Sequence, residues 1–345
     1  MMVVVYHAQS LLRGYESRIA LPPSIFNSTP TLSTLGASGV DLFFVISGFI
    51  MAYITYNKRG IRNVLPFIKR RLIRIVPVYW LYTAVMAGLL FFIPTLFSTA
   101  RFDAQETLLS LLFIPYLPAV NATAPVLEVG WTLSYEMYFY GLIAVGLFFG
   151  YRVVPLLLGL FFTACVLARY AFPIDSPVMN LVTNPILFEF FLGYLCGYMY
   201  VTKVPIPTYL AALFLASGVA GYVLWAMALT TLPLAVFAFL IVTGSVFLEK
   251  SVNLSKFQFL ARIGDSSYTL YLTHYLLIPA LGKVCIATGF WNYLPPSAFI
   301  LVALTMCVAA GYALYVLLER PLVTWLSHWA FPVPSPAGIG QKKHP

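Results

Sequence analysis

Charged residues are scarce in this sequence. Asp, Glu, Lys and Arg make up 9% of its 345 residues, whereas hydrophobic residues make up 61%. An ordinary soluble domain has about 25% charged residues, and a soluble fold of this composition would aggregate. Apolar runs recur along most of the chain, and a helix needs about 20 apolar residues to cross the core of a bilayer. The composition therefore predicts an all-α, polytopic integral membrane protein.

Cysteine is also scarce, and its placement excludes two kinds of site. The four cysteines lie far apart, inside or beside apolar runs, and form no CxxC pair: Cys165, Cys196, Cys285 and Cys307. They predict neither a disulfide framework nor a zinc site, and we expect no bound metal. The N-terminal sequence MMVVVYHA lacks a basic segment and a small-residue cleavage site, so it does not resemble a signal peptide.

The apolar runs predict nine complete membrane spans and the end of a tenth. The complete spans are placed near residues 37–57, 75–97, 126–149, 153–172, 184–202, 207–226, 230–248, 265–282 and 297–318. Residues 1–9 are expected to form the outer end of a further helix, which His7 closes and which is truncated in this chain. We therefore expect about ten transmembrane helices. They form one domain over residues 1–330, followed by a short cytoplasmic tail at 331–345.

The basic residues predict the orientation of these spans. Residues 58–74 contain seven Lys and Arg and no acid, and short loops rich in Lys and Arg face the cytoplasm. Counting helices from this segment places both termini in the cytoplasm, which is the arrangement of a multi-pass protein of the cell inner membrane. The net charge of +9 is spread over such loops, so it does not predict nucleic-acid binding.

Two further segments are expected outside the spans. The run TLLSLLFIPYLPA, at residues 107–119, is short and closed by prolines, which favours an interfacial or re-entrant segment. Residues 10–36 contain Pro22, Pro23, Pro30 and many Ser and Thr, which favours an irregular loop outside the membrane.

Five ionisable side chains stand out within the predicted spans: His7, Asp41, Glu136, Glu189 and His274. Such groups are costly in a bilayer unless they face protein or water, so each is a candidate for a functional role. A neutral histidine beside a carboxylate can take a proton from an alcohol, because its unperturbed pKa is about 6.5. We therefore select His7 as the candidate base, with Glu136 and Asp41 as candidate catalytic carboxylates.

Each choice has a structural alternative. His7 could be an interfacial residue at a frayed helix end, and His274 could hydrogen-bond a neighbouring helix. Asp41 could cap the N-terminus of its helix. The aromatic residues around Glu136 could be an interfacial belt or a platform for a sugar ring.

A cytoplasmic run, KRRLIR, precedes a helix that we expect to begin at Val76 and Pro77. Arg71 and Arg74 are three residues apart, so they share a face if the helix extends back that far. A basic run of this kind usually marks topology only. Its functional interpretation is a clamp for a phosphorylated donor, because guanidinium groups bind phosphate in a bidentate way.

Several segments together resemble the acyltransferase-3 family of membrane O-acyltransferases. They are VVVYHA, GVDLFFVISGFIM, FIKRRLIRIVPVYWLYT, LFIPY, GWTLSYEMYFY, IGDSSYTLYLTH and LERPL, in the order in which the family has them. The resemblance extends over almost the whole chain, and the motif sequences are similar to those of bacterial exopolysaccharide O-acetyltransferases. The family has an arginine upstream of its first-helix histidine, at a position before the start of this sequence, which suggests a start codon further upstream.

The resemblance implies a fold of ten transmembrane helices and an activity. The donor is cytoplasmic acyl-CoA, with acetyl-CoA as the expected co-substrate and no tightly bound cofactor. The acceptor is a sugar hydroxyl of a polysaccharide or a lipid-linked oligosaccharide, within membrane lipid. The family's essential histidine falls on His7 and its RxxR pair on Arg71 and Arg74, which implies donor binding; other polar motif positions fall on Asp41 and Glu136.

Two other functions fit part of the sequence. A transporter or flippase would also have intramembrane charges, although inverted repeats of the kind many transporters have are not evident. A non-catalytic membrane subunit of a polysaccharide export system would need only the spans and the basic loops. The absence of a GxSxG motif means that a covalent intermediate would have to form on His7 itself.

Overall fold

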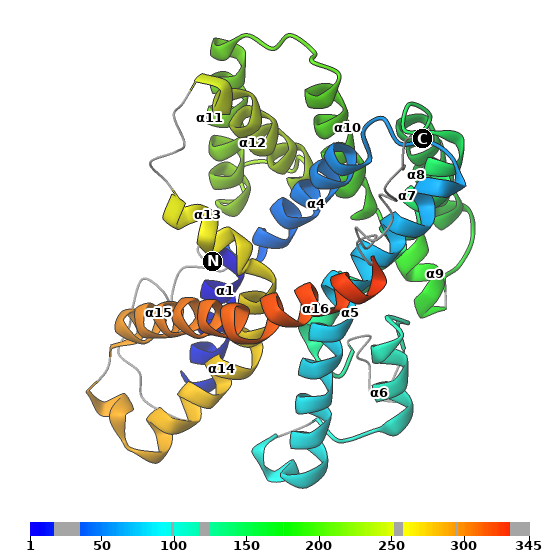
Figure 1. Ribbon diagram of the computed structural model, residues 1–345. Coiled ribbons are helices and arrows are strands. Elements are labelled where there is room, and N and C mark those ends of the chain that lie inside the picture. Colours follow the sequence, from blue (N-terminus) through cyan, green and yellow to red (C-terminus); the bar gives the residue numbers. More distant parts are fainter. Residues whose placement is uncertain are drawn as a thin grey trace, which may run out of the picture.

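The computed structural model describes residues 1–16, 35–97, 100–116, 125–174, 176–251, 258–293 and 295–331, and these residues form helices and no strand. The helices are α1 (Met2–Glu16), α4 (Gly39–Thr55), α5 (Ile61–Phe92), α6 (Ala104–Leu111), α7 (Trp131–Phe149), α8 (Val154–Ala171), α9 (Pro177–Val182), α10 (Leu187–Val201), α11 (Thr208–Ala226), α12 (Leu234–Leu248), α13 (Gln258–Asp265), α14 (Ser267–Ala287), α15 (Pro296–Leu314) and α16 (Arg320–Ala330). Figure 1 shows their arrangement.

The helices confirm the prediction of an all-α polytopic membrane protein. Eight helical segments in the part of the chain described are long and apolar enough to span a bilayer. Two further helices have 15 residues each: the apolar α12, which packs on α11, and α1, which packs on α14 and α15. α6 has eight residues and is too short to span, because spanning takes about 20 residues.

The first helix differs from its prediction. α1 continues to Glu16, so His7 lies inside the helix and not at its end. The helix continues because Val4, Ala8 and Leu12, spaced by four residues, form a buried stripe against α14 and α15. The interpretation of His7 as part of a frayed end is therefore wrong, and the outer loop does not begin at residue 10. Pro22, Pro23 and Pro30 lie outside the described residues.

The basic run is also helical, which corrects the predicted start at Val76 and Pro77. α5 begins at Ile61 and contains both Pro66 and Pro77. Lys and Arg are good helix formers, and neighbouring helices in a membrane protein can satisfy the carbonyl group that an internal proline leaves unpaired. Arg71 and Arg74 therefore project from one continuous helix. The expected tail begins beside this run, where the Arg70 guanidinium lies 5.2 Å from the Phe331 ring centroid; residues 332–345 lie beyond what the structure describes.

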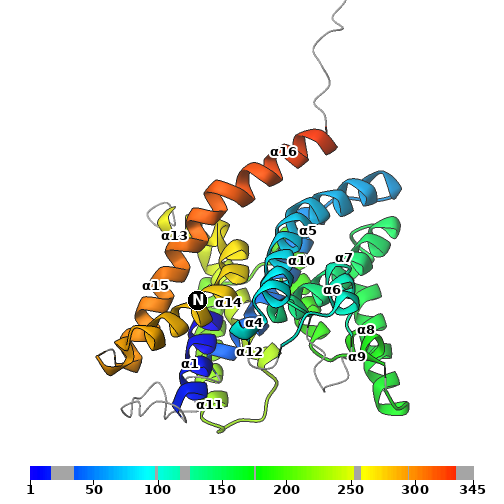
Figure 2. The same cartoon turned by 90° about the horizontal axis from the view of Figure 1, so that it is seen from below.

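Three hydrophobic clusters hold the helices together. The largest joins α4, α5, α7, α8, α10 and α14, the second joins α1, α14 and α15, and the third joins α4, α10, α11 and α12. α4, α10 and α14 thus each belong to two clusters. Figure 2 shows α15 running on into α16 through a π-helical segment at Tyr315–Glu319, and α16 packs on α5. The site described below lies where the clusters meet.

α4 and α10 pack with their backbones in close contact, because glycines lie at the crossing. A Cβ atom on Gly193 would lie 1.9 Å from the carbonyl oxygen of Val45, and one on Gly48 would lie 2.1 Å from that of Phe190. Small residues permit this approach between membrane helices. The contact fixes the position of α4, which carries Asp41 and Ser47.

Gly193→Ala should therefore destabilise the protein by about 1–3 kcal/mol, because the added methyl group meets backbone that cannot move aside. Thermal unfolding of the purified protein in detergent measures the effect. Gly141→Ala on α7 is the matched control, since nothing lies within 4 Å of its Cβ position. Equal unfolding temperatures for the two variants would contradict the close α4–α10 contact.

Candidate functional site

Two adjacent cavities contain most of the polar residues that the sequence singled out. The larger has a volume of about 620 Å³ and is lined by residues of α1, α4, α5, α7, α13 and α14. The smaller, of about 310 Å³, is lined mainly by residues of α1, α4 and the turn before α7. Val3, Val40 and Tyr271 line both cavities, so they form the partition between them.

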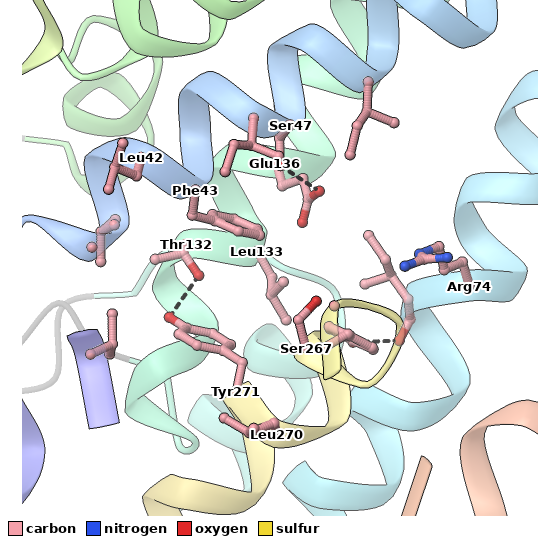
Figure 3. Close-up of a pocket in the computed structure, with 18 of the residues that line it drawn as sticks. Leu42, Phe43, Ser47, Arg74, Thr132, Leu133, Glu136, Ser267, Leu270 and Tyr271 are labelled. Carbon is pink, nitrogen blue, oxygen red and sulfur yellow. Dashed lines mark hydrogen bonds between the residues drawn. The ribbon is translucent and has the colours of Figure 1, made fainter. Parts of the chain in front are cut away.

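The larger cavity is lined by Glu136, Arg71 and Arg74, and Figure 3 shows Glu136 and Arg74 on either side of it. Glu136 on α7 is 6% exposed and accepts hydrogen bonds from the hydroxyl groups of Tyr140 and, at 3.4 Å, Ser47. Both arginines act electrostatically on its carboxyl group. The Glu136 carboxyl group is thus buried, with two hydroxyl donors and two guanidinium groups around it.

The two arginines share one wall of this cavity, as their spacing on a helix predicted. The Arg71 guanidinium lies 6.0 Å from the Tyr140 ring centroid, and its buried Nε has no hydrogen-bond partner among the described residues. Arg74 is more exposed and interacts electrostatically with both Glu136 and Glu319. The Arg71 side chain therefore keeps a donor available for an anion that enters the cavity.

The smaller cavity brings His7 and Asp41 together. The ring centroid of His7 lies 5.1 Å from that of His274 and 6.1 Å from that of Tyr275. Glu128, in the turn before α7, acts electrostatically on His7 and accepts a hydrogen bond of 2.9 Å from the Tyr275 hydroxyl group. Glu136 lines the other cavity, so the structure separates two carboxylates that the sequence assigned to one site.

Asp41 is in the first turn of α4, but it does not occupy the capping position. That position belongs to Ser38, whose side chain makes no capping hydrogen bond. The carboxyl group of Asp41 instead lies beside that of Glu189 on α10, and the two groups interact electrostatically. Asp41 and Glu189 therefore form an acidic pair at the edge of the smaller cavity.

His274 lies at the partition between the cavities. Its side chain is fully buried, lines the larger cavity, and contacts the ring of His7, which lines the smaller. Neither ring nitrogen has a hydrogen-bond partner among the described side chains. The alternative that His274 hydrogen-bonds a neighbouring helix is therefore not what the structure contains.

Two acidic residues of the site were missed by the sequence analysis. One is Glu128, at the smaller cavity. The other is Glu319, which is buried at the end of the π-helical segment and accepts a hydrogen bond from Thr269 on α14. The LERPL motif contains Glu319, and that resemblance was its only signal; Glu128 lies near the start of the span predicted at 126–149, so the rule for intramembrane charges could have selected it. Within the described ranges no group of three or more His, Cys, Asp or Glu could hold a metal ion.

The sequence is similar to known acyltransferases. The family model described as "Acyltransferase domain" matches residues 1–316. The chain is 38% identical over 301 residues to the exopolysaccharide production protein ExoZ of Rhizobium meliloti, which covers 84% of this chain and 90% of that protein. It is 33% identical over 112 residues to the acyltransferase MdmB of Streptomyces mycarofaciens, covering 32% of this chain and 28% of that protein. No solved structure matches the chain.

Proposed function

The chain belongs to the acyltransferase-3 family, and from this membership we propose that it transfers an acyl group, acetyl in the first instance, from cytoplasmic acyl-CoA to a sugar hydroxyl of an exopolysaccharide or another surface glycan. One observation carries the proposal. A candidate base and a pair of arginines line two cavities that meet at a shared partition. A donor and an acceptor that enter from different sides can thus meet inside the membrane.

The larger cavity is proposed to bind the donor. Arg71 and Arg74 line it, and guanidinium groups suit the phosphates of coenzyme A. Its volume of about 620 Å³ falls within the range of about 300–1,000 Å³ that is typical of small-molecule sites. By the predicted topology the arginines lie toward the cytoplasm, where acyl-CoA is made. The pantetheine arm would then extend from the arginines toward His274.

The smaller cavity is proposed to bind the acceptor. It presents the carboxyl groups of Asp41 and Glu128 together with the ring of Trp131. Carboxylates accept hydrogen bonds from sugar hydroxyl groups, and an aromatic ring provides an apolar face on which a sugar can pack. The acceptor is a hydroxyl group of a polysaccharide or of its lipid-linked precursor, because the cavity lies within the membrane.

The proposed reaction is direct transfer. His7 takes the proton of the sugar hydroxyl, and the oxygen attacks the thioester carbon. The new C–O bond forms, the C–S bond breaks, and the leaving sulfur receives the proton from the His7 imidazolium. Asp41 and Glu128 hold the sugar and the imidazole in place, while Glu136 orders the arginines on the donor side.

The topology completes the proposal. The chain is a multi-pass membrane protein of an acyltransferase family. We place it in the inner membrane with both termini in the cytoplasm, with one catalytic domain over residues 1–330 and a cytoplasmic tail over 331–345. The excess of Lys and Arg in residues 58–74 supports this orientation.

Inside-out membrane vesicles test the function. Given radiolabelled acetyl-CoA and the host's exopolysaccharide precursor, vesicles with the protein should transfer label to the glycan, and vesicles without it should not. A flippase would move glycan across the membrane without a need for acyl-CoA. A non-catalytic subunit would restore export in cells and transfer no label in vesicles. Absence of transfer with acetyl-CoA, succinyl-CoA and propionyl-CoA alike would overturn the proposal.

A further inference from the structure

A second histidine lies at the proposed reaction centre with its hydrogen-bonding capacity unused. His274 is 0% exposed, and both of its ring nitrogens lack a hydrogen-bond partner among the described side chains. Leaving a buried polar group unpaired is unfavourable, and nearly all such groups in native proteins have a partner. When an unpaired buried group faces a cavity, its hydrogen-bond partner is expected to be an atom of the bound ligand.

The neighbours of His274 decide its charge. The groups with the largest effects on its ring are His7, the N-terminal amino group and the backbone carbonyls of Leu270 and Tyr271. No carboxylate is among these groups, whereas Glu128 acts on His7. A buried imidazolium without a counter-charge is strongly unfavourable, so His274 is neutral. A neutral imidazole has one N–H donor and one acceptor nitrogen.

The position of His274 places its N–H group on the side of the cavity that is proposed to bind acyl-CoA. His274 lines the larger cavity, which also contains Arg71 and Arg74, whereas His7 lines the smaller. The two rings are 5.1 Å apart between centroids. The sugar oxygen that His7 deprotonates attacks the thioester carbon. This carbon must therefore lie close to the rings of both His7 and His274. The thioester carbonyl oxygen then lies on the larger-cavity side, where His274 is.

We propose that His274 is a catalytic residue that donates a hydrogen bond from its neutral imidazole to the thioester carbonyl oxygen, and so stabilises the negative charge that develops there during acyl transfer. This inference rests on the proposed function. The sugar oxygen forms the C–O bond as the C–S bond breaks, the hydroxyl proton passes through His7 to the leaving sulfur, and His274 keeps its own proton throughout. Donors fixed in a buried site are effective in this role, because they need no reorganisation as the charge forms.

Two analogues of acetyl-CoA separate this role from a structural one. The first is a ketone in which a methylene replaces the thioester sulfur and the carbonyl is kept; the second is ethyl-CoA, which has no carbonyl. The wild-type protein should bind the ketone about tenfold more tightly than ethyl-CoA, as one added hydrogen bond predicts. His274→Phe should bind both equally, and His274→Gln, which keeps an N–H donor, should retain part of the preference.

The rate of acyl transfer should also fall when His274 loses its N–H donor. His274→Phe should lower kcat by about 10²–10³-fold, as removal of one oxyanion donor does, and should raise KM for acyl-CoA by about tenfold or less, because the hydrogen bond to the ground-state carbonyl is lost as well. Ile278→Val, a buried substitution on α14 away from both cavities, is the control and should leave kcat unchanged. His274→Leu carries the same test if the phenylalanine variant does not fold.

The outcomes are distinguishable. A ketone preference that persists in His274→Phe or His274→Leu, or that is absent from the wild type, would overturn the role of His274. Failure of the wild type to bind either analogue would instead overturn the proposed donor site. A loss of the preference in both nonpolar variants, with partial retention in His274→Gln, would support the inference.

Discussion

Replacing His7 with alanine should lower the rate of acyl transfer by about 10²–10⁴-fold, the contribution typical of a general base. His7 faces the smaller cavity beside Asp41, and its ring lies 5.1 Å from that of His274. Among the residues that line the smaller cavity, it is the only group that is a good base near neutral pH. Transfer of radiolabelled acetyl groups to the glycan in vesicles measures the loss.

Two further variants make this prediction specific. His7→Gln keeps a polar side chain of similar size but provides no base, so its activity should be as low as that of His7→Ala. Ser10→Ala changes an exposed position of the same helix and should retain full activity. Binding of acyl-CoA should be nearly unchanged in all three, because His7 does not line the larger cavity. Wild-type transfer by His7→Ala would rule out the assignment of the base.

The double variant Arg71→Ala, Arg74→Ala should lower kcat/KM for acyl-CoA by about 10²–10⁴-fold. A hydrogen bond to a charged group contributes about 1.5–3 kcal/mol, and 1.4 kcal/mol corresponds to a factor of about ten. Both guanidinium groups line the larger cavity. The loss should occur mainly in KM, since phosphates remote from the reacting bond are bound in the ground state as well.

The neighbouring arginine provides a matched control. Arg70→Ala removes an equal charge from the same helix, but Arg70 lies against the Phe331 ring and does not line the cavity. Its KM should stay close to that of the wild type. The KM of the double variant Arg71→Lys, Arg74→Lys should lie between that of Arg70→Ala and that of Arg71→Ala, Arg74→Ala, because lysine keeps the charge and loses the bidentate geometry. If Arg70→Ala were as impaired as the double variant, Arg71 and Arg74 would contribute only positive charge and no specific binding of the phosphates.

The sequence determined the class of the protein and the positions of most helices. Hydropathy is a property of each segment alone, so the spans from α4 to α15, except the start of α5, could be placed within a few residues. The predicted helix bounds were wrong where packing against other helices determines how far a helix extends. α1 extends past His7 because Val4, Ala8 and Leu12 bury against distant helices, and α5 continues through Pro77.

The sequence also provided most of the residues of the site but not their grouping. Helical spacing alone placed Arg71 and Arg74 on one face, and the ordered motifs selected His7. Only the tertiary structure placed Glu136 beside Ser47, 89 residues away, paired Asp41 with Glu189, and put His274 between the two cavities. The physical reason is that apolar burial along each helix is local, whereas contacts between polar groups depend on how α1, α4, α7 and α14 pack, which no single segment encodes.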